Sequence, residues 1–219
     1  MVLLAIMNIF IAKLSGQEDI IIGTPMSGRN HPDLEHIIGM FANTIALRNY
    51  PAGEKTFVEF LDGLKENCLE AFENQGYPFE YLVEKLAINR IPGRNPLFDV
   101  MFTLQNDLVE NLKLSQPGNH DNDKDNDYLE IESYGFENKT SKFDFSLEVV
   151  EREQIALSLE YNVHLFQRES IDKFAIYFKE IAAAVIHNKN SRLHEIAISH
   201  EFLDAASALN DADAGDFGF

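Results

Sequence analysis

The sequence predicts a mixed α/β domain, and three observations lead to this fold class. Residues 20–23, Ile-Ile-Ile-Gly, form an unbroken β-branched run of the kind found in strands buried on both faces. Residues 56–75 and 171–187 repeat apolar side chains at helical spacing. Residues 143–151 and 154–162 have alternating faces and are predicted to form a β-hairpin. With 219 residues and 45% apolar content, the chain can build one large domain or two small ones.

The chain opens with an apolar helix, predicted over residues 2–14 and ended by Ser15 and Gly16. This run is too short to cross a bilayer, which takes roughly 20 residues. It also lacks the basic start and the cleavage site of a secretory signal. Because no capping residue precedes the run, the helix is expected to begin outside this chain, which would make the chain part of a longer protein.

A strand, a loop and a second strand follow the opening helix. The strand at residues 20–23 is expected to give way to a loop from Pro25, which is rich in proline and glycine. Residues 37–42 are expected to form a turn or a short helix. A strand then begins at about Asn43 and ends before Pro51.

Two helices occupy the middle of the sequence. Thr56 and Glu59 match a capping box, and the helix that they open is predicted to reach about Gln75. Its predicted inward stripe consists of Phe57, Phe60, Leu61, Leu64, Cys68, Leu69 and Phe72. After a break at Gly76-Tyr77-Pro78, a second helix is predicted over residues 79–87.

The second half is predicted to hold four strands and a long helix. A strand is expected at residues 97–105, followed by an acidic loop at 107–127, a strand at 128–136 and then the hairpin. The helix at residues 171–187 is expected to bury Phe174, Ile176, Tyr177, Ile181, Ala184 and Val185. A short helical segment and an acidic tail at 211–219 complete the chain.

Charge and cysteine content exclude several classes of function. The formal net charge of −18, from 36 acidic and 18 basic residues, disfavours binding to nucleic acid and to anionic membranes. The single cysteine, Cys68, excludes an internal disulfide framework and a thiolate metal cluster. It suits a reducing cytosol, and its helical spacing from Leu64 and Phe72 predicts a core position.

Neither a metal site nor a catalytic centre emerges from the sequence. An acidic run imitates an EF-hand loop, but its sixth position holds Asn126 instead of the glycine that the turn needs, and no helix is predicted after it. We therefore expect a solvated loop; the acidic residues are Asp121, Asp123, Asp125, Asp127 and Glu132. The seven histidines show no zinc-enzyme spacing, and no nucleophile with a general base can be assembled.

Several segments, in order along the chain, resemble the motifs of the condensation domains of nonribosomal peptide synthetases. The first four are Asp19-Ile-Ile-Ile-Gly-Thr-Pro-Met-Ser-Gly-Arg29, Ile38-Gly-Met-Phe-Ala-Asn-Thr-Ile-Ala-Leu-Arg48, Glu73-Asn-Gln-Gly-Tyr-Pro-Phe-Glu-Tyr-Leu-Val83 and Arg94-Asn-Pro-Leu-Phe-Asp99. Residues 141–147 and 160–166 are similar to the closing strands of the family. The resemblance covers about residues 3–200.

The resemblance implies that residues 1–200 are the C-terminal lobe of a chloramphenicol acetyltransferase-like (CoA-dependent acyltransferase) fold, with residues 201–219 as an acidic linker or tail. In this family two lobes enclose a tunnel, in which an acceptor amine attacks a donor thioester. Both substrates arrive on the phosphopantetheine arms of carrier proteins. The catalytic histidine belongs to a His-His-x-x-x-Asp-Gly motif of the N-terminal lobe, and this sequence has no His-His pair. We therefore expect no catalytic residue, metal or directly bound cofactor here.

The same resemblance implies a set of partners and a location. The expected partners are the N-terminal lobe, peptidyl carrier proteins and an adjacent adenylation domain, in a cytoplasmic enzyme. Three alternatives remain open: an epimerization domain, a free-standing docking module, and a complete one-lobe acyltransferase. The run at residues 95–102 favours the condensing branch over epimerization. An upstream His-His motif would exclude the docking module, and a local base would be required for the one-lobe enzyme.

Ten residues in these motifs are candidates for supporting the substrate channel. Some of them have both a functional and a local structural interpretation. Gly28 permits a tight turn that Arg29 could hold by an ion pair, or Arg29 is an ordinary loop residue. Asn43 and Thr44 could line a polar channel or cap a strand. Tyr77, Pro78 and Phe79 are expected to hold two helices together, and Arg94 and Asn95 are expected to hold the turn before a strand. The tenth candidate is Arg48, at the end of the second motif.

Overall fold

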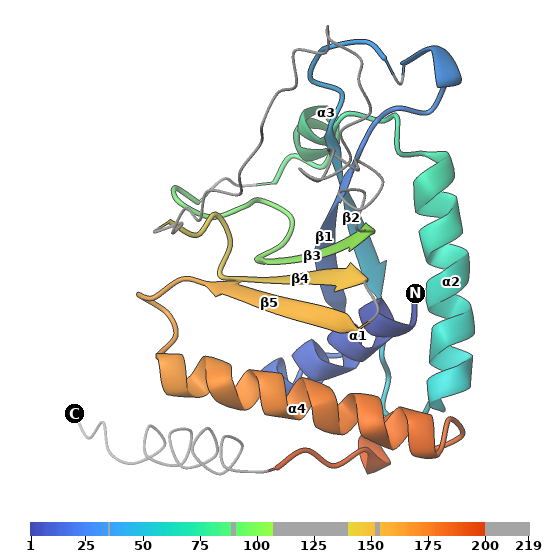
Figure 1. Ribbon diagram of the computed structural model, residues 1–219, viewed down its shortest axis with the longest axis vertical. Helices are drawn as coiled ribbons and strands as arrows, with labels where there is room; N and C mark the ends of the chain where they lie inside the picture. Colours follow the sequence, from blue (N-terminus) through green and yellow to red (C-terminus); the bar gives the residue numbers. More distant parts are fainter. Residues whose placement is uncertain (35, 89–90, 107–139, 152–153, 200–219) are drawn as a thin grey trace, which may run out of the picture.

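The computed structural model describes residues 1–34, 36–88, 91–106, 140–151 and 154–199 (Figure 1). Three predictions lie outside these ranges: the acidic loop at 107–127 with its EF-hand-like carboxylates, the strand at 128–136, and the tail at 201–219. The remaining predictions can be compared with the structure element by element.

A mixed five-stranded sheet forms the centre of the fold, as predicted. Its order is β2-β1-β3-β4-β5, and neighbouring strands are antiparallel in the β2-β1 and β4-β5 pairs and parallel in the β1-β3 and β3-β4 pairs. The antiparallel β4-β5 pair confirms the predicted hairpin. The strands are β1 (Ile20–Met26), β2 (Asn43–Asn49), β3 (Val100–Asn106), β4 (Phe145–Glu151) and β5 (Ile155–Tyr161).

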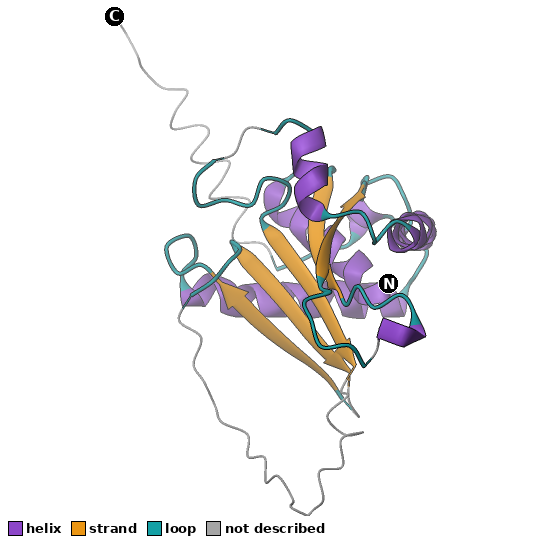
Figure 2. Cartoon of the chain, turned by 90° about the horizontal axis from the view of Figure 1, so that it is seen from above, coloured by secondary structure: helices purple, strands orange, loops and turns teal. Residues whose placement is uncertain are grey.

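The described residues form four α-helices, and all four were expected from the sequence. The helices α1 and α4 lie on one face of the sheet, and α2 runs alongside β2 at its edge (Figures 1 and 2). The elements are α1 (Val2–Ser15), α2 (Phe57–Glu73), α3 (Phe79–Lys85) and α4 (Arg168–His187), with short 3-10 helices η1 (Pro32–Leu34) and η3 (Leu193–Glu195).

The helix α1 is the most deeply buried element. Every residue from 4 to 10 is buried, so the helix is covered on all sides, as expected of an apolar helix without a polar face. Its Phe10 ring lies 5.4 Å from Phe174 of α4 and 6.2 Å from Phe145 of β4, measured between centroids. Gly16 ends the helix in a left-handed conformation, with φ of 67°. The apolar start is therefore a core helix.

No helix in the described part of the chain has both the length and the apolar character needed to cross a membrane.

The α2 start confirms the predicted capping box, since Thr56 Oγ1 accepts a hydrogen bond from the Glu59 N–H and the Glu59 carboxylate accepts one from the Thr56 N–H at 2.8 Å. These bonds hold the pKa of Glu59 below its usual range, because they stabilise the charged carboxylate.

The first strand is longer than predicted. Pro25 was expected to begin a loop, but it lies inside β1 opposite Thr44 of β2. The β3 strand pairs with β1 only at Ile22 and Gly23, so the missing N–H of Pro25 falls where β1 has a single neighbour. The sequence pattern could not predict which residues of β1 would pair with one neighbouring strand and which with two.

Two core assignments and one strand start were also wrong. Leu69 of α2 and Ile176 of α4 are 49% and 53% exposed, because each lies at the margin of its helix's apolar stripe. The strand β3 begins at Val100 instead of Leu97. The Asn95 Oδ1 accepts hydrogen bonds from the N–H groups of Leu97 and Phe98, which keeps these residues in a turn.

A close contact between Phe98 and Gly23 positions the segment that precedes β3. The ring of Phe98 lies directly on the backbone of Gly23 in β1, so that a Cβ at position 23 would be 2.2 Å from the ring. Phe98 is 4% exposed. The absence of a side chain at Gly23 therefore lets a buried ring rest on the sheet.

We expect Gly23→Ala to destabilise the chain by about 1–3 kcal/mol, because the added methyl group overlaps the buried Phe98 ring. Urea unfolding followed by circular dichroism measures this change. Gly63→Ala is the matched control: Gly63 lies within α2 with nothing within 4 Å of its added Cβ, so this variant should gain about 0.5–1 kcal/mol. Equal effects at the two positions would contradict the packing of Phe98 on Gly23.

Candidate functional site

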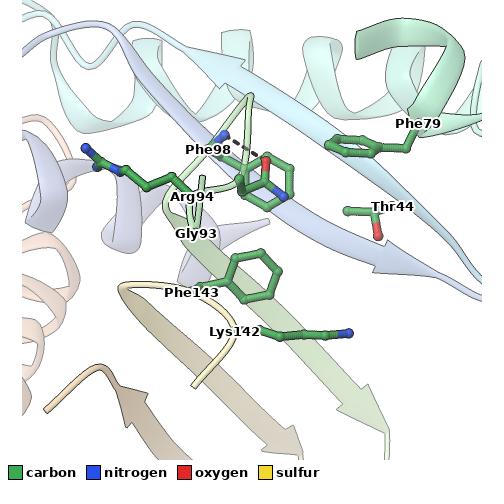
Figure 3. A pocket seen from close by; sticks show the side chains of 8 residues that line it. Thr44, Phe79, Gly93, Arg94, Phe98, Lys142 and Phe143 are labelled. Atoms are coloured by element: carbon green, nitrogen blue, oxygen red, sulfur yellow. Dashed lines mark hydrogen bonds between the residues drawn. The ribbon is translucent and has the colours of Figure 1, made fainter. Parts of the chain in front are cut away.

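A hollow of about 400 Å³ brings together residues from four separated segments of the chain (Figure 3). Four of its lining residues were predicted site residues, and the remaining ones belong to or adjoin the same motifs. The lining consists of Thr44, Phe79, Gly93, Arg94, Asn95, Phe98, Lys142 and Phe143.

Three aromatic rings line the hollow. Phe98 is buried, and its centroid lies 5.8 Å from that of Phe79 at the start of α3 and 5.6 Å from that of Phe143 before β4. Phe79 and Phe143 are partly exposed. Figure 3 shows the Phe79 and Phe143 rings on either side of Phe98, with Thr44 and Lys142 beside them. The lining is therefore an aromatic surface with polar groups next to it.

Arg94 joins the segment that carries Phe98 to the segment that carries Phe143. Its guanidinium binds the Asp99 carboxylate at 2.6 and 3.2 Å and reaches Asp144 at 3.4 Å. Burial and the nearby Asp99 raise the pKa of Asp144, and Arg94 opposes this shift. Asp99 follows Phe98 and Asp144 follows Phe143. The Arg94 guanidinium therefore holds together the two chain segments that come directly after these rings.

Asn43, the residue before Thr44, also links separate segments of the chain by hydrogen bonds. Its Nδ2 donates hydrogen bonds to the carbonyls of Gln75 at 2.8 Å and Tyr77 at 2.9 Å, and its Oδ1 accepts one from the Phe79 N–H at 3.4 Å. The amide thus ties the start of β2 to the connection between α2 and α3. Thr44, the next residue, is the one that lines the hollow.

Other predicted site residues lie outside the hollow lining. Tyr77 is 47% exposed, and Pro78 is the residue before α3. Their segment connects two helices, as the sequence suggested. Arg48 makes a bidentate ion pair with Asp19 at 2.6 and 2.8 Å, which lowers the pKa of that carboxyl. It lies four residues along β2 from Thr44, a distance of about 13 Å in an extended strand.

Gly28 and Arg29 also lie apart from the hollow lining and organise their own loop. Gly28 has φ of 66°, and a Cβ there would be 1.8 Å from the carbonyl oxygen of Phe41. The Arg29 guanidinium donates to the carbonyl of Leu34 and lies 4.4 Å above the Phe41 ring. Among the described residues Arg29 makes these contacts in place of the ion pair considered from the sequence.

Sequence reasoning did not assign Gly93, Phe98, Lys142 and Phe143 to the site. They belong to, or directly precede, segments that carry the resemblance, but their joint position depends on the register in which β3 pairs with β1 and β4. A motif-by-motif view could have included Phe98 and Phe143 as the aromatic residues before two parallel strands. Their proximity to Phe79 required the tertiary structure.

The described residues contain no group of three or more histidine, cysteine, aspartate or glutamate side chains that could hold a metal ion. His31 lies 3.5 Å from Asp33, and His194 bonds the carbonyl of Gly53 at 2.9 Å, both at exposed positions. His120 and His200 are outside the described residues. None of the described histidines lines the hollow.

Comparison with solved structures establishes the class of fold. The chain matches a four-domain nonribosomal peptide synthetase bound to AMP and glycine with a TM-score of 0.77 at 20% identity, covering 93% of this chain and 16% of that one. It matches the starter condensation domain of rhizomide synthetase with a TM-score of 0.69 at 17% identity, covering 91% and 45%. The fold is therefore the chloramphenicol acetyltransferase-like fold.

Comparison of sequences identifies the family. The family model for the condensation domain matches residues 1–206, and this chain belongs to that family. The chain is 45% identical over 204 residues to gramicidin S synthase 2 of Brevibacillus brevis, covering 92% of this chain and 4% of the synthase. It thus spans only a small part of the length of this relative.

We expect Asn43→Ala to destabilise the chain by about 1–3 kcal/mol, because two carbonyls and one N–H lose their partner at a half-buried site. Urea unfolding of the variant tests this value. Asn74→Ala removes one exposed amide bond, to the Glu70 carbonyl, and should change stability by about 0.5 kcal/mol or less. A similar loss in both variants would contradict the tie between β2 and α3.

We expect Arg94→Met to lower the urea midpoint at pH 7, because Asp99 and Asp144 would remain charged beside each other without their cation. The difference from the original chain should shrink as pH falls, because burial and the nearby Asp99 raise the pKa of Asp144, and protonation of Asp144 removes the repulsion between the two carboxylates. Lys65→Met, on the exposed face of α2, is the control and should show no such pH dependence. A pH-independent loss in Arg94→Met would argue against the ionic role.

Proposed function

We propose that this chain is the C-terminal lobe of a nonribosomal peptide synthetase condensation domain, with residues 1–200 forming the lobe and 201–219 a linker or tail. In the intact domain it would form one wall of the tunnel in which an acceptor amine attacks a donor thioester. The products of this step are an amide bond and a free thiol on the donor arm.

The observation that carries the proposal is the convergence of the family's motifs on one hollow. Segments around Thr44, Phe79, Arg94 and Phe143 are far apart in the chain and line the same concave surface. The family match over residues 1–206 supports the same assignment. The 45% coverage of a solved condensation domain supports a single lobe as the unit present here.

The sheet face opposite α1 and α4 supports a tunnel wall. Strand alternation directs Phe145, Leu147 and Val149 of β4 into the core, whereas Ser146 and Glu148 point to the other face. These two are only partly buried, and Thr103 of β3 lies opposite Glu148. A half-buried face with hydroxyl and carboxylate groups suits contact with polar, tethered substrates.

The chemistry itself would come from the other lobe. The sequence holds no His-His pair, and none of the described histidines lines the hollow. A partner lobe also accounts for apolar side chains left in solvent, since Ile38 is 100% exposed and Met40 is 91% exposed. The N-terminal lobe would supply the base and cover such surfaces, and the family match favours this function over a free-standing docking module.

Carrier proteins are the proposed substrate partners. Their phosphopantetheine arms would bring both thioesters to the tunnel, and this chain would bind no cofactor of its own. An adjacent adenylation domain and a cytoplasmic location follow from the same assignment to an assembly-line enzyme.

A condensation assay with aminoacyl-loaded donor and acceptor carrier proteins tests the proposal. The chain should be inactive alone and should form dipeptidyl product when a purified N-terminal lobe of the family is added. The matched control is the same mixture with an N-terminal lobe whose His-His motif is replaced by Ala-Ala, which should form no product. Mass spectrometry of the acceptor carrier protein detects the dipeptide.

Two outcomes would overturn the proposal. Product from the chain alone would require a base within its 219 residues and would favour a one-lobe acyltransferase. Binding of the N-terminal lobe or the carriers without any product would favour the docking module.

A further inference from the structure

The aromatic hollow has the chemical character of a binding site for an apolar side chain. Its floor is the buried Phe98 ring, and the partly exposed Phe79 and Phe143 rings lie within 6 Å of that floor, measured between centroids. Partly exposed rings that face the same open space gain from an apolar group that removes their remaining surface from water. The volume of about 400 Å³ exceeds that of any single amino-acid side chain and falls in the range of small-molecule pockets.

The Arg94 guanidinium does not place an unpaired charge in the hollow. Arg94 lines the hollow, but Asp99 and Asp144 bind its guanidinium. Figure 3 shows the Arg94 side chain directed away from Thr44 and Lys142. The Asn95 amide oxygen is likewise used by two backbone N–H groups. The arginine and the asparagine therefore stabilise the lining, and neither presents a free charge to the hollow.

Two polar groups remain available beside the rings. Among the described residues, the Thr44 hydroxyl makes no hydrogen bond and the Lys142 ammonium forms no ion pair, while both line the hollow. A hydroxyl can donate to a carbonyl or accept from an N–H, and an ammonium can donate to a carbonyl. An aminoacyl group carries these polar atoms next to its side chain, so one molecule can satisfy both parts of the site.

We propose that this hollow receives the apolar side chain of a tethered aminoacyl substrate, with Phe79 and Phe143 as its walls and Thr44 as the hydrogen-bonding group beside it. The inference rests on the proposed function for the identity of the substrate. It goes beyond that function by assigning a side-chain site to named residues of this lobe. Phe98 forms the floor of the hollow, and Arg94 is a positioning residue that holds the segments of Phe98 and Phe143 together.

A binding experiment on the 219-residue chain tests the site without any catalysis. N-acetyl-leucine amide and N-acetylglycine amide are titrated separately while backbone amide signals are followed by NMR. Leucine amide should shift the signals of Thr44, Gly93 and Lys142 and should bind about tenfold more tightly than glycine amide, because only its side chain buries apolar surface.

Three variants separate the parts of the site. Phe143→Ala should weaken leucine amide about fivefold or more and leave glycine amide unchanged, since it removes one apolar wall. Thr44→Val preserves shape and removes the hydroxyl, so it should weaken both probes by a similar factor of about three to ten. Tyr81→Ala, at an exposed position of α3 outside the lining, is the matched control and should change neither affinity.

Three results would overturn this inference: equal affinity for the two probes, shifts confined to other parts of the chain, or unchanged leucine binding in both Phe143→Ala and Thr44→Val. The condensation assay distinguishes this failure from failure of the proposed function. If mixing with the N-terminal lobe yields dipeptide while leucine and glycine bind alike, the function stands and the side-chain site does not. If leucine binds selectively but no dipeptide forms, the site stands as a pocket for apolar amides and its role in condensation falls.

Discussion

The burial of α1 between the sheet and the other helices is the constraint on which the rest of the structure depends. Seven consecutive residues of α1 are buried, and Phe10 contacts rings from both β4 and α4. Because α1 lies at the start of the sequence and both of these partners lie in its C-terminal half, the core closes only when the two ends of the described chain meet. The helices α1 and α4 then occupy one face of the sheet (Figure 2), and Ser146 and Glu148 of β4 point to the other face.

The hollow depends on this arrangement through a short chain of contacts. Phe98 rests on Gly23, and Asn43 holds the beginning of α3. Arg94 links Asp99, the residue after Phe98, to Asp144, the residue before β4. Each contact joins segments that are distant in sequence. The site is therefore a product of strand register and of side-chain hydrogen bonds, and no single motif contains it.

Motif residues divide into two groups according to what they touch. Gly28, Arg29 and Arg48 stabilise a loop and a strand pair away from the hollow, whereas Thr44 and Phe79 present atoms to it and Arg94 supports its wall. Some motif residues therefore stabilise the fold away from the hollow, and others line the hollow or hold its wall.

Local sequence alone determined the class of the fold, the four helices, the capping box at Thr56 and the hairpin of β4 and β5, because periodicity, turn residues and caps act over a few neighbouring positions. It misjudged Pro25, Leu69 and Ile176, whose environments depend on which neighbour covers them. The tertiary structure alone decided that Phe79, Phe98 and Phe143 meet, since this requires the register of parallel strands formed by segments far apart in the chain. It also decided that Arg94 would serve two carboxylates, for the same reason.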